Sequence, residues 1–377
     1  MDRMPPPFDF AQAPLLVIWE CTRSCALACR HCRADADLRR DPDELSTVEG
    51  QDILRQTQGM GTPIFVLSGG DPLVREDLEV LVKAGKGMGL RMGTIPAATP
   101  SLTRERLQSL RDAGLDQVAF SIDGPDAVSH DAFRQTPGAF DRVIQGVQWA
   151  QELGLNIQIN TCLAAWNFAG YDKIEALVRG LPIAFWEFFF LIPVGRGAQL
   201  GGLEPQQFEE VFEKLWKLSR QENFVVKLTE GQHFRRFVMQ QEAAAGAGAA
   251  ERTEHAVARP ASLRAGIRLP KRAVNAGDGF MFIDHLGGIC PSGFLPEVRG
   301  NVRRDQLAKV YREDELFIKL RDHDQLIGRC GVCEYRQICG GSRARAFAVT
   351  GNVWETDPAC AHQPAAWTSD RKPSRRA

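Results

Sequence analysis

Short apolar runs alternate with amphipathic stretches along the first two hundred residues of the chain. Polar or glycine-containing segments bound each apolar run, which is typical of buried strands. Strands are predicted at 15–19, 64–67, 91–95, 117–122, 156–162 and 184–191. The stretches between them repeat apolar residues at helical spacing, which predicts helices at 42–58, with Ser46 as N-cap, and at 78–86, 104–113, 140–153 and 174–180.

This alternation of strand and helix predicts an α/β fold with a parallel sheet and right-handed crossovers. Ligands of such sheets bind in the crevice outside the carboxyl ends of the strands. We therefore expect the functional residues in the loops that follow the strands.

The pattern changes after residue 203. Residues 204–241 carry a helical apolar stripe, and the next segment is rich in Ala, Gly and Arg without usable periodicity. Strand character returns at 280–283, and Gly287-Gly288 predicts a hairpin turn. The expected organisation is an N-terminal extension (1–14), an α/β barrel region (15–203), a helical connection (204–241), a flexible linker or lid (242–279), a cysteine-rich domain (280–362) and a basic tail (363–377).

Charge and composition are those of an ordinary globular protein. The 377 residues include 46 Lys plus Arg and 47 Asp plus Glu, a net charge of −1, so no global field indicates a nucleic-acid or membrane partner. The first 14 residues lack a signal pattern, and the most apolar later run, 184–194, is interrupted by Glu187 and is too short to cross a bilayer. We expect a cytoplasmic protein, in which ten clustered cysteines favour metal or redox sites over disulfides.

Three cysteines stand in the loop after the first predicted strand. Cys25, Cys29 and Cys32 have the spacing C-x3-C-x2-C. Three thiolates can hold three corners of an iron-sulfur cube and leave one iron open for a ligand. The alternatives are buried free cysteines or a zinc site completed by Cys21, which we otherwise interpret as a bystander at the strand end.

This spacing, with His31 just before the last cysteine, resembles the signature of the radical S-adenosylmethionine (SAM) enzymes. The resemblance implies a [4Fe-4S] cluster whose open iron binds the amino and carboxylate groups of SAM. An electron from the cluster then cleaves SAM to a 5′-deoxyadenosyl radical. It also implies a partial (β/α)6 barrel, in agreement with the six predicted strands, and a low-potential electron donor such as flavodoxin or ferredoxin.

Several strand ends carry residues that match the SAM contacts of this family. Glycines let the backbone approach a ligand closely, and a neighbouring carboxylate can accept a hydrogen bond from an ammonium group. Gly69, Gly70 and Asp71 stand where the family has its GGE motif, with Asp71 replacing the glutamate that holds the SAM amino group. The alternative interpretation of this stretch is a simple turn.

The remaining SAM contacts are also implied by the resemblance. They are His31 in the cysteine motif, Ser121 and Asp123 at the ribose, Arg134 at the carboxylate, and Asn160 and Pro193 beside the adenosyl group. For Arg134 the alternative is a solvated surface charge.

A second group of cysteines lies near the C-terminus. Cys330, Cys333, Cys339 and Cys360 supply four thiolates, which suit either a zinc ion or a fully ligated cluster. Residues 280–360 resemble the SPASM domain of many radical SAM enzymes, which implies an auxiliary [4Fe-4S] cluster on these four residues. Two further family ligand positions hold Asp305 and Arg343. We therefore predict one auxiliary cluster, with Cys290 as a free thiol near the substrate, a catalytic candidate, or an alternative ligand.

The segments 19–34 and 333–360 resemble radical SAM enzymes that modify tetrapyrrole side chains, such as heme synthases that oxidatively decarboxylate propionates. This implies hydrogen abstraction from a propionate β-carbon, with the auxiliary cluster accepting the remaining electron. Arg196, Arg343 and Arg345 are candidates to steer the carboxylates, and ordinary surface charge is the alternative. Two other functions remain open: a maturase that crosslinks or oxidises a ribosomally made peptide, and a non-catalytic iron-sulfur or zinc scaffold.

Overall fold

A computed structural model describes residues 7–245 and 269–368. Its centre is one ten-stranded sheet in the order β10-β9-β8-β1-β2-β3-β4-β5-β6-β7. The strands are β1 (Leu16–Glu20), β2 (Ile64–Ser68), β3 (Arg91–Thr94), β4 (Gln117–Ser121), β5 (Asn156–Leu163), β6 (Phe185–Phe190), β7 (Val225–Thr229), β8 (Phe280–Ile283), β9 (Gly288–Cys290) and β10 (Gly300–Asn301). All neighbours from β8 to β7 pair in parallel, whereas β9 and β10 pair antiparallel.

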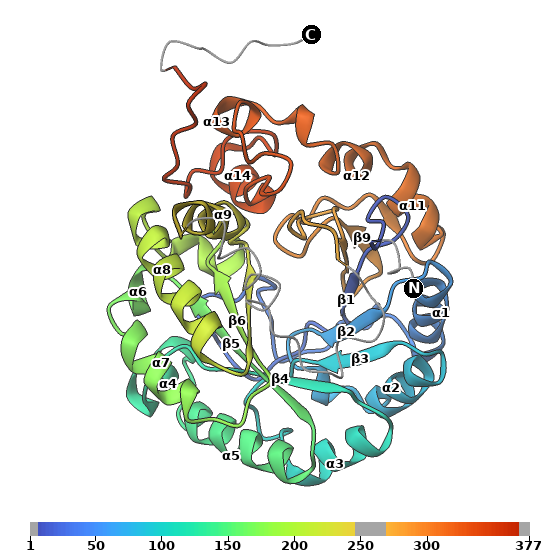
Figure 1. Cartoon of the computed structure of the whole chain (residues 1–377). Coiled ribbons are helices and arrows are strands. Elements are labelled where there is room, and N and C mark those ends of the chain that lie inside the picture. Colours follow the sequence, from blue (N-terminus) through green and yellow to red (C-terminus); the bar gives the residue numbers. More distant parts are fainter. Residues whose placement is uncertain (1–6, 246–268, 369–377) are drawn as a thin grey trace, which may run out of the picture.

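Helices cover the outer face of this curved sheet (Figure 1). Between the strands of the barrel lie α1 (Thr47–Gly59), α2 (Leu78–Gly87), α3 (Arg104–Asp112), α4 (Ala127–Arg134), α5 (Ala139–Glu152), α6 (Ala165–Phe168), α7 (Tyr171–Arg179), α8 (Pro205–Gln221) and α9 (Phe234–Ala245). The C-terminal part adds α11 (Leu307–Glu313), α12 (Glu315–Leu320), α13 (Gly328–Gly331) and α14 (Arg343–Thr350), and short 3-10 helices include η1 (Pro72–Val74) and η2 (Gly195–Gln199).

The expected α/β partial barrel is confirmed, and local signals account for many of its elements. Ser46 caps α1 in a capping box with Glu49, as its sequence position indicated. Alternate strand residues point away from the barrel axis, into the core between the sheet and the helices, where Val17 and Trp19 of β1 are fully buried. The Trp19 ring lies so close to α1 that a Cβ at Gly50 would meet it at 2.8 Å. The other set of strand residues faces the inside of the barrel.

The sheet has ten strands, whereas six were predicted for the barrel region, and one of the additional strands lies in the region 204–241. Residues 204–241 are not wholly helical, because β7 separates α8 from α9. The helical stripe of α8 ends at Leu218, and the Val-Val-Lys-Leu-Thr run that follows is β-branched and alternating, a pattern that extends the sheet beyond β6.

The cysteine-rich region contributes to the same sheet. β8 pairs in parallel with β1, and the predicted hairpin turn at Gly287-Gly288 joins β8 to the antiparallel β9. Figure 1 shows the C-terminal helices on the arc between α1 and α9, so they complete the ring around the barrel. Much of the predicted linker or lid lies outside the described residues.

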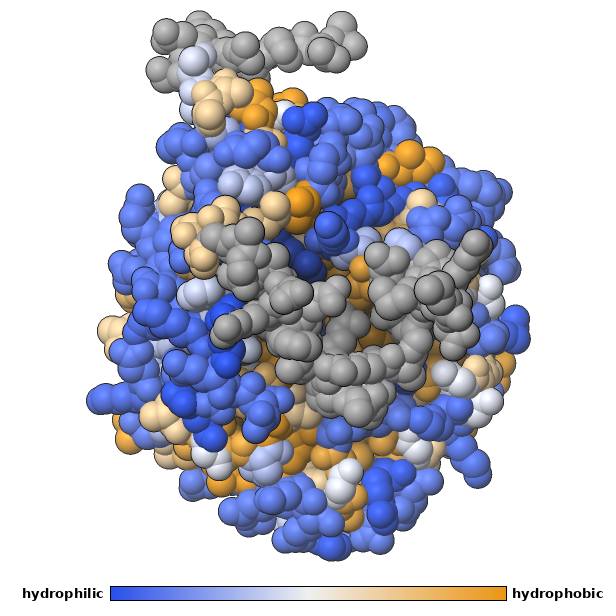
Figure 2. Space-filling view, viewed as in Figure 1, coloured by the Kyte–Doolittle hydropathy of each residue, from blue (hydrophilic) through white to orange (hydrophobic). Residues whose placement is uncertain are grey.

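The surface in Figure 2 is predominantly hydrophilic over the surrounding helices. Among the described residues, no helix is both long and apolar enough to cross a membrane.

Candidate active site

The three cysteines of the first motif lie together in the loop after β1. Cys25 and Cys29 are buried, and they share a small apolar cluster with Leu27, against which Cys32 packs. Each sulfur accepts one hydrogen bond: the Leu27 N–H donates to Cys25 (3.4 Å), the Ala36 N–H donates to Cys32 (3.4 Å), and the Arg134 guanidinium donates to Cys29 (3.6 Å).

Such hydrogen bonds stabilise negative charge on sulfur and are typical of cluster ligands. Burial raises the pKa of the Cys25 thiol to about 12 and also raises that of Cys29, so these groups need the positive charge of a metal to become thiolates. The donor set therefore fits a cluster with three protein ligands.

Cys21 lies apart from these three residues. It belongs to the main hydrophobic core, on the same face of the chain as Trp19, and its carbonyl accepts a hydrogen bond from Arg75. The structure does not bring it to the other cysteines as a fourth ligand.

The glycine pair after β2 packs directly against the start of the cysteine loop. The Gly70 N–H donates to Thr22 O (2.8 Å), and the Asp71 N–H donates to Ser24 O (2.7 Å). A Cβ at Gly69 would meet Thr22 O at 2.4 Å, and one at Gly70 would meet Ser24 O at 2.4 Å. The absence of side chains here therefore positions the loop that carries the cysteines.

We expect the substitution Gly70→Ala to displace this loop. The added methyl would overlap two backbone carbonyls, which should cost roughly 1–3 kcal/mol of unfolding free energy and lower the iron bound after reconstitution. Denaturant unfolding and iron analysis measure both effects. Gly87→Ala is the control: nothing lies within 4 Å of its Cβ position, and helix propensity predicts a gain of roughly 0.5–1 kcal/mol. Equal iron content in the two variants would contradict this role of Gly70.

The Asp71 carboxylate is fully buried and already engaged by the chain. Its Oδ1 accepts from the N–H groups of Leu73 (3.1 Å) and Ala97 (3.3 Å), and its Oδ2 accepts from the Thr99 hydroxyl (2.5 Å). These bonds cap η1 and tie two loops together at the barrel rim. The predicted contact of Asp71 with the SAM amino group stays a prediction.

Arg134, at the end of α4, connects Asp123 to the cysteine loop. Its Nη2 lies 2.5 Å from Asp123 Oδ2, and its Nη1 donates to Cys29 Sγ. Asp123 is fully buried, and its other oxygen accepts from the Cys162 N–H at 2.8 Å. Burial raises the pKa of Asp123, but the charge of Arg134 outweighs it and holds that pKa below its ordinary value. Arg134 is therefore no solvated surface charge.

His31 begins an aromatic stack beside the cysteines. Its ring is parallel to Phe133 at 4.5 Å, and Phe133 stacks on Trp166 at 4.5 Å. Burial lowers the pKa of His31 to about 3, so the ring is neutral at pH 7.

Three further predicted contacts lie at neighbouring strand ends. Ser121 closes β4 and pairs in register with Asn160 of β5, whose Oδ1 accepts from Gln158 Nε2 at 2.6 Å. Pro193 follows β6, just before η2. The carboxyl ends of β4 to β6 thus hold these residues on one rim, and their contacts with SAM stay predictions.

An ion-pair network that was not predicted from the sequence joins the cysteine loop to the C-terminal strands. Arg33 Nη2 lies 2.5 Å from Glu20 Oε2, and His285 Nδ1 lies 3.0 Å from Glu20 Oε1. Arg33 also lies over the Phe282 ring at 4.6 Å. Burial raises the pKa of Glu20, but Arg33 and His285 outweigh it, so that pKa lies below its usual value. A glutamate at the end of an apolar strand is the sequence signal for this network.

We expect His285 to make stability depend on pH. Its hydrogen bond to Glu20 raises its pKa above the ordinary value of 6.5. The stabilisation is therefore fully present below pH 6.5 and is lost as the pH rises through the raised folded-state value. Denaturant unfolding from pH 5.5 to 9 should show this decline in the wild type and a flatter profile in His285→Gln. Parallel profiles would contradict the assignment.

Two of the three arginines considered for substrate carboxylates, Arg343 and Arg345, are committed to the protein itself, so for these two the expectation is wrong. Arg196 donates to the carbonyls of Cys29 and Ala36. Arg343 is buried and donates to the carbonyls of Val353 and Glu355, and Arg345 pairs with buried Asp357. The guanidinium groups of Arg343 and Arg345 thus brace loops, whereas Arg196 Nη2 has no hydrogen-bond partner among the described residues, so a contact of Arg196 with a substrate carboxylate stays a prediction.

The second group of cysteines lines one cavity between α9 and the C-terminal loops. Cys330, Cys333, Cys339 and Cys360 all face it. Three of the sulfurs accept hydrogen bonds, from Arg343 Nη2 to Cys330 (3.7 Å), from the Tyr335 N–H to Cys333 (3.4 Å) and from the Gly341 N–H to Cys339 (3.3 Å). Burial raises the pKa of the Cys360 thiol to about 11. Four converging sulfurs with such donors fit a fully ligated cluster.

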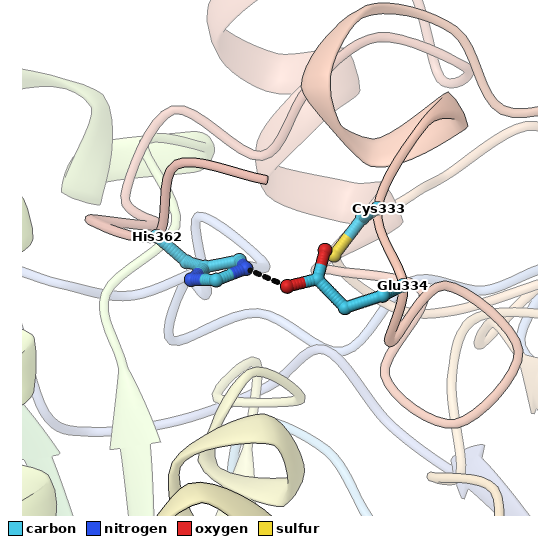
Figure 3. A group of neighbouring side chains, drawn as sticks. All are labelled: Cys333, Glu334 and His362. Carbon is cyan, nitrogen blue, oxygen red and sulfur yellow. Dashed lines mark hydrogen bonds and ion pairs between the residues drawn. The ribbon is translucent and has the colours of Figure 1, made fainter. Parts of the chain in front are cut away.

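The rim of this cavity offers other ligand types. Figure 3 shows the His362 ring hydrogen-bonded to Glu334, Nε2 to Oε1 at 2.9 Å, beside the Cys333 sulfur. One ligand atom of each of these three residues lies within 4.8 Å of the others, a spacing that also suits a single metal ion. The zinc alternative for this region therefore stays open.

Cys290 lies elsewhere. It pairs in register with Phe282 across the β8–β9 hairpin and is 2% exposed, and burial raises its pKa to about 12. The structure does not place it in the cavity of the other four cysteines, so it is not positioned as an alternative ligand there.

Comparison with known proteins identifies the family. The radical SAM superfamily profile matches residues 19–173. The AdoMet-dependent heme synthase of Oleidesulfovibrio alaskensis is 36% identical over 358 residues, covering 94% of this chain and 89% of the relative. That of Methanosarcina barkeri is 34% identical over 352 residues, covering 93% and 97%.

Solved structures share the fold. Streptococcus suis SuiB bound to S-adenosylmethionine aligns with a TM-score of 0.70 at 17% identity, over 93% of this chain and 78% of SuiB. The enzyme anSMEcpe with bound AdoMet aligns with a TM-score of 0.66 at 13% identity, over 92% and 94%. The chain therefore belongs to the radical SAM superfamily, in the family of the AdoMet-dependent heme synthases, and it is an enzyme whose cofactors are SAM and a [4Fe-4S] cluster.

Proposed function

We propose that this enzyme converts propionate side chains of an iron tetrapyrrole to vinyl groups by oxidative decarboxylation. Loss of a hydrogen atom from the β-carbon, of CO2 and of one electron turns each propionate into a vinyl group, which balances the atoms and electrons. The observation that carries the proposal is the similarity to AdoMet-dependent heme synthases along nearly the whole chain.

When bound, the [4Fe-4S] cluster and SAM would supply the 5′-deoxyadenosyl radical that takes the hydrogen atom from the propionate β-carbon. In this proposal Cys25, Cys29 and Cys32 hold the cluster. Backbone groups of Gly69 and Gly70 orient the methionyl part of SAM. Ser121 and Asp123 contact the ribose, Arg134 contacts the SAM carboxylate, and Asn160 and Pro193 lie beside the adenosyl group, with the His31 ring next to the cluster. Arg134 also donates to Cys29 Sγ.

The inside of the barrel has two chemically different walls, which supports a large substrate with both apolar and carboxylate groups. Ile18 of β1, Val66 of β2 and Phe282 of β8 share register positions and form an apolar wall. Across from them, Gln158, Glu187 and Lys227 of β5 to β7 form a hydrogen-bonded polar wall. The Lys227 ammonium, 39% exposed, is paired with Glu187 at 3.1 Å and donates to Gln158 at 3.0 Å, so a substrate carboxylate would be the acceptor for its third N–H.

We further propose that Cys330, Cys333, Cys339 and Cys360 hold one auxiliary [4Fe-4S] cluster that accepts the electron left after hydrogen abstraction. Its support is the cavity that these four residues line, with donors directed at three of their sulfurs. A low-potential donor such as flavodoxin or ferredoxin supplies the electron for SAM cleavage.

A peptide substrate is the second candidate. The chain is 28% identical to the PqqA peptide cyclase of Bradyrhizobium diazoefficiens, over 93% of its length. The two candidates differ in what should stimulate SAM cleavage, so one experiment separates them.

The test is anaerobic reconstitution with iron and sulfide, then reduction with SAM, with iron-coproporphyrin added or withheld. We expect 5′-deoxyadenosine whose yield rises with the porphyrin, and porphyrin products whose mass has fallen by one or two decarboxylations. If the yield of 5′-deoxyadenosine is the same with and without the porphyrin, and the porphyrin mass does not change, the tetrapyrrole proposal is overturned and a peptide substrate is favoured.

A further inference from the structure

His233, just before α9, is a completely buried histidine whose two ring nitrogens both lack a hydrogen-bond partner in the described part of the chain. The ring packs against Phe208 and Phe212. Its nearest carboxylate oxygen, Asp357 Oδ2, is 3.8 Å from Nδ1 and already accepts from Ser342 and Arg345. Buried polar groups are nearly always hydrogen-bonded, so an unpartnered imidazole indicates a missing partner.

The unpartnered ring lines the same cavity as the four C-terminal cysteines. A second buried donor without a partner, the Arg236 Nε–H, belongs to another side chain that lines this cavity, although the guanidinium end of Arg236 is paired with Glu209 and Gln240. Two independent N–H groups thus border a space in which the described chain offers them no acceptor.

His362, on the rim, makes a useful comparison. Its ring nitrogens are engaged by Glu334 and Gln240, so it needs nothing from the cavity. His233 is different because either tautomer of a neutral imidazole keeps one N–H, and that hydrogen has no acceptor until the cavity is filled.

We propose that His233 donates a hydrogen bond to a sulfur atom of the auxiliary cluster and thereby raises the reduction potential of that cluster. Reduction adds negative charge to the sulfurs, and an N–H dipole directed at them stabilises the reduced form more than the oxidised form. The inference rests on the auxiliary cluster of the proposed function.

The test uses the full chain with Cys25, Cys29 and Cys32 changed to Ala, so that the auxiliary cluster is the only signal. The midpoint potential is measured by a redox titration followed by electron paramagnetic resonance. We expect His233→Phe to shift it to more negative values by about 59 mV, the equivalent of a tenfold loss in the one-electron reduction equilibrium. His233→Gln or His233→Asn, which restores an N–H, should recover the potential.

The matched control is His130→Phe, which removes another buried histidine that does not line this cavity and should leave the potential unchanged. A potential that stays constant in His233→Phe, with the cluster present by iron analysis, would overturn the inference and leave the proposed function intact. Failure of the parent chain to assemble any C-terminal cluster would overturn this inference together with the proposed auxiliary cluster.

A second measurement needs no substitution at His233. In the reduced parent protein labelled with 15N-histidine, pulsed electron paramagnetic resonance should detect a coupled histidine nitrogen and an exchangeable proton. A cluster that shows neither coupling contradicts the hydrogen bond, even if His233→Phe proves too unstable to purify.

Discussion

Replacing Cys25, Cys29 and Cys32 together with Ala should abolish formation of 5′-deoxyadenosine, because we propose these residues as the protein ligands of the SAM-binding cluster. The chain should still bind roughly four irons at its C-terminal site, against roughly eight in the wild type. Mass spectrometry of the nucleoside and iron analysis measure the two quantities after anaerobic reconstitution.

Cys21→Ala is the matched control for this experiment. Cys21 is fully buried and stands four residues before the motif, directly after β1, but it packs in the main core. It should keep the full iron content and SAM cleavage. Persistent SAM cleavage by the triple variant would refute the assignment of the motif.

Replacing Cys330 and Cys333 with Ala should separate SAM cleavage from product formation. The N-terminal cluster does not depend on these thiols, so deoxyadenosine should still appear, while roughly half of the iron and nearly all of the decarboxylated product should be lost. Single-turnover assays that quantify nucleoside and porphyrin in the same sample give both values.

Cys290→Ala provides the comparison for that variant. Cys290 is buried on β9, outside the cavity that the other four cysteines line, so its loss should leave the iron content unchanged. If the Cys330 and Cys333 double variant still formed product at the wild-type rate, the proposed role of the auxiliary cluster as electron acceptor would be wrong.

Elements whose signals lie within a few residues of sequence were predicted correctly. The Ser46 cap, the β8–β9 turn at Gly287-Gly288 and the strands β1 to β6 follow from spacing over a few residues. The prediction failed at β7, because the helical stripe of α8 was extended past its end at Leu218 into a short β-branched run.

Side-chain roles that depend on distant partners were harder to predict. Arg345 looks like a cation beside the substrate until the structure shows the buried Asp357 with which it pairs. Likewise, Arg33, Glu20 and His285 belong to three separate segments, and only the pairing of β8 with β1 brings them together. Periodicity indicates which face of a strand is buried, but it does not reveal which strand lies beside it.

The pairing of β8 with β1 also bears on how the protein is made. Leu16 lies opposite Phe280, so during synthesis β1 must wait for a partner strand that lies far downstream in the chain. Closing such a long loop is slow, and until it closes one edge of β1 stays unpaired. The cysteine loop meanwhile lacks the contact of His285 with Glu20 and the Phe282 ring over which Arg33 lies.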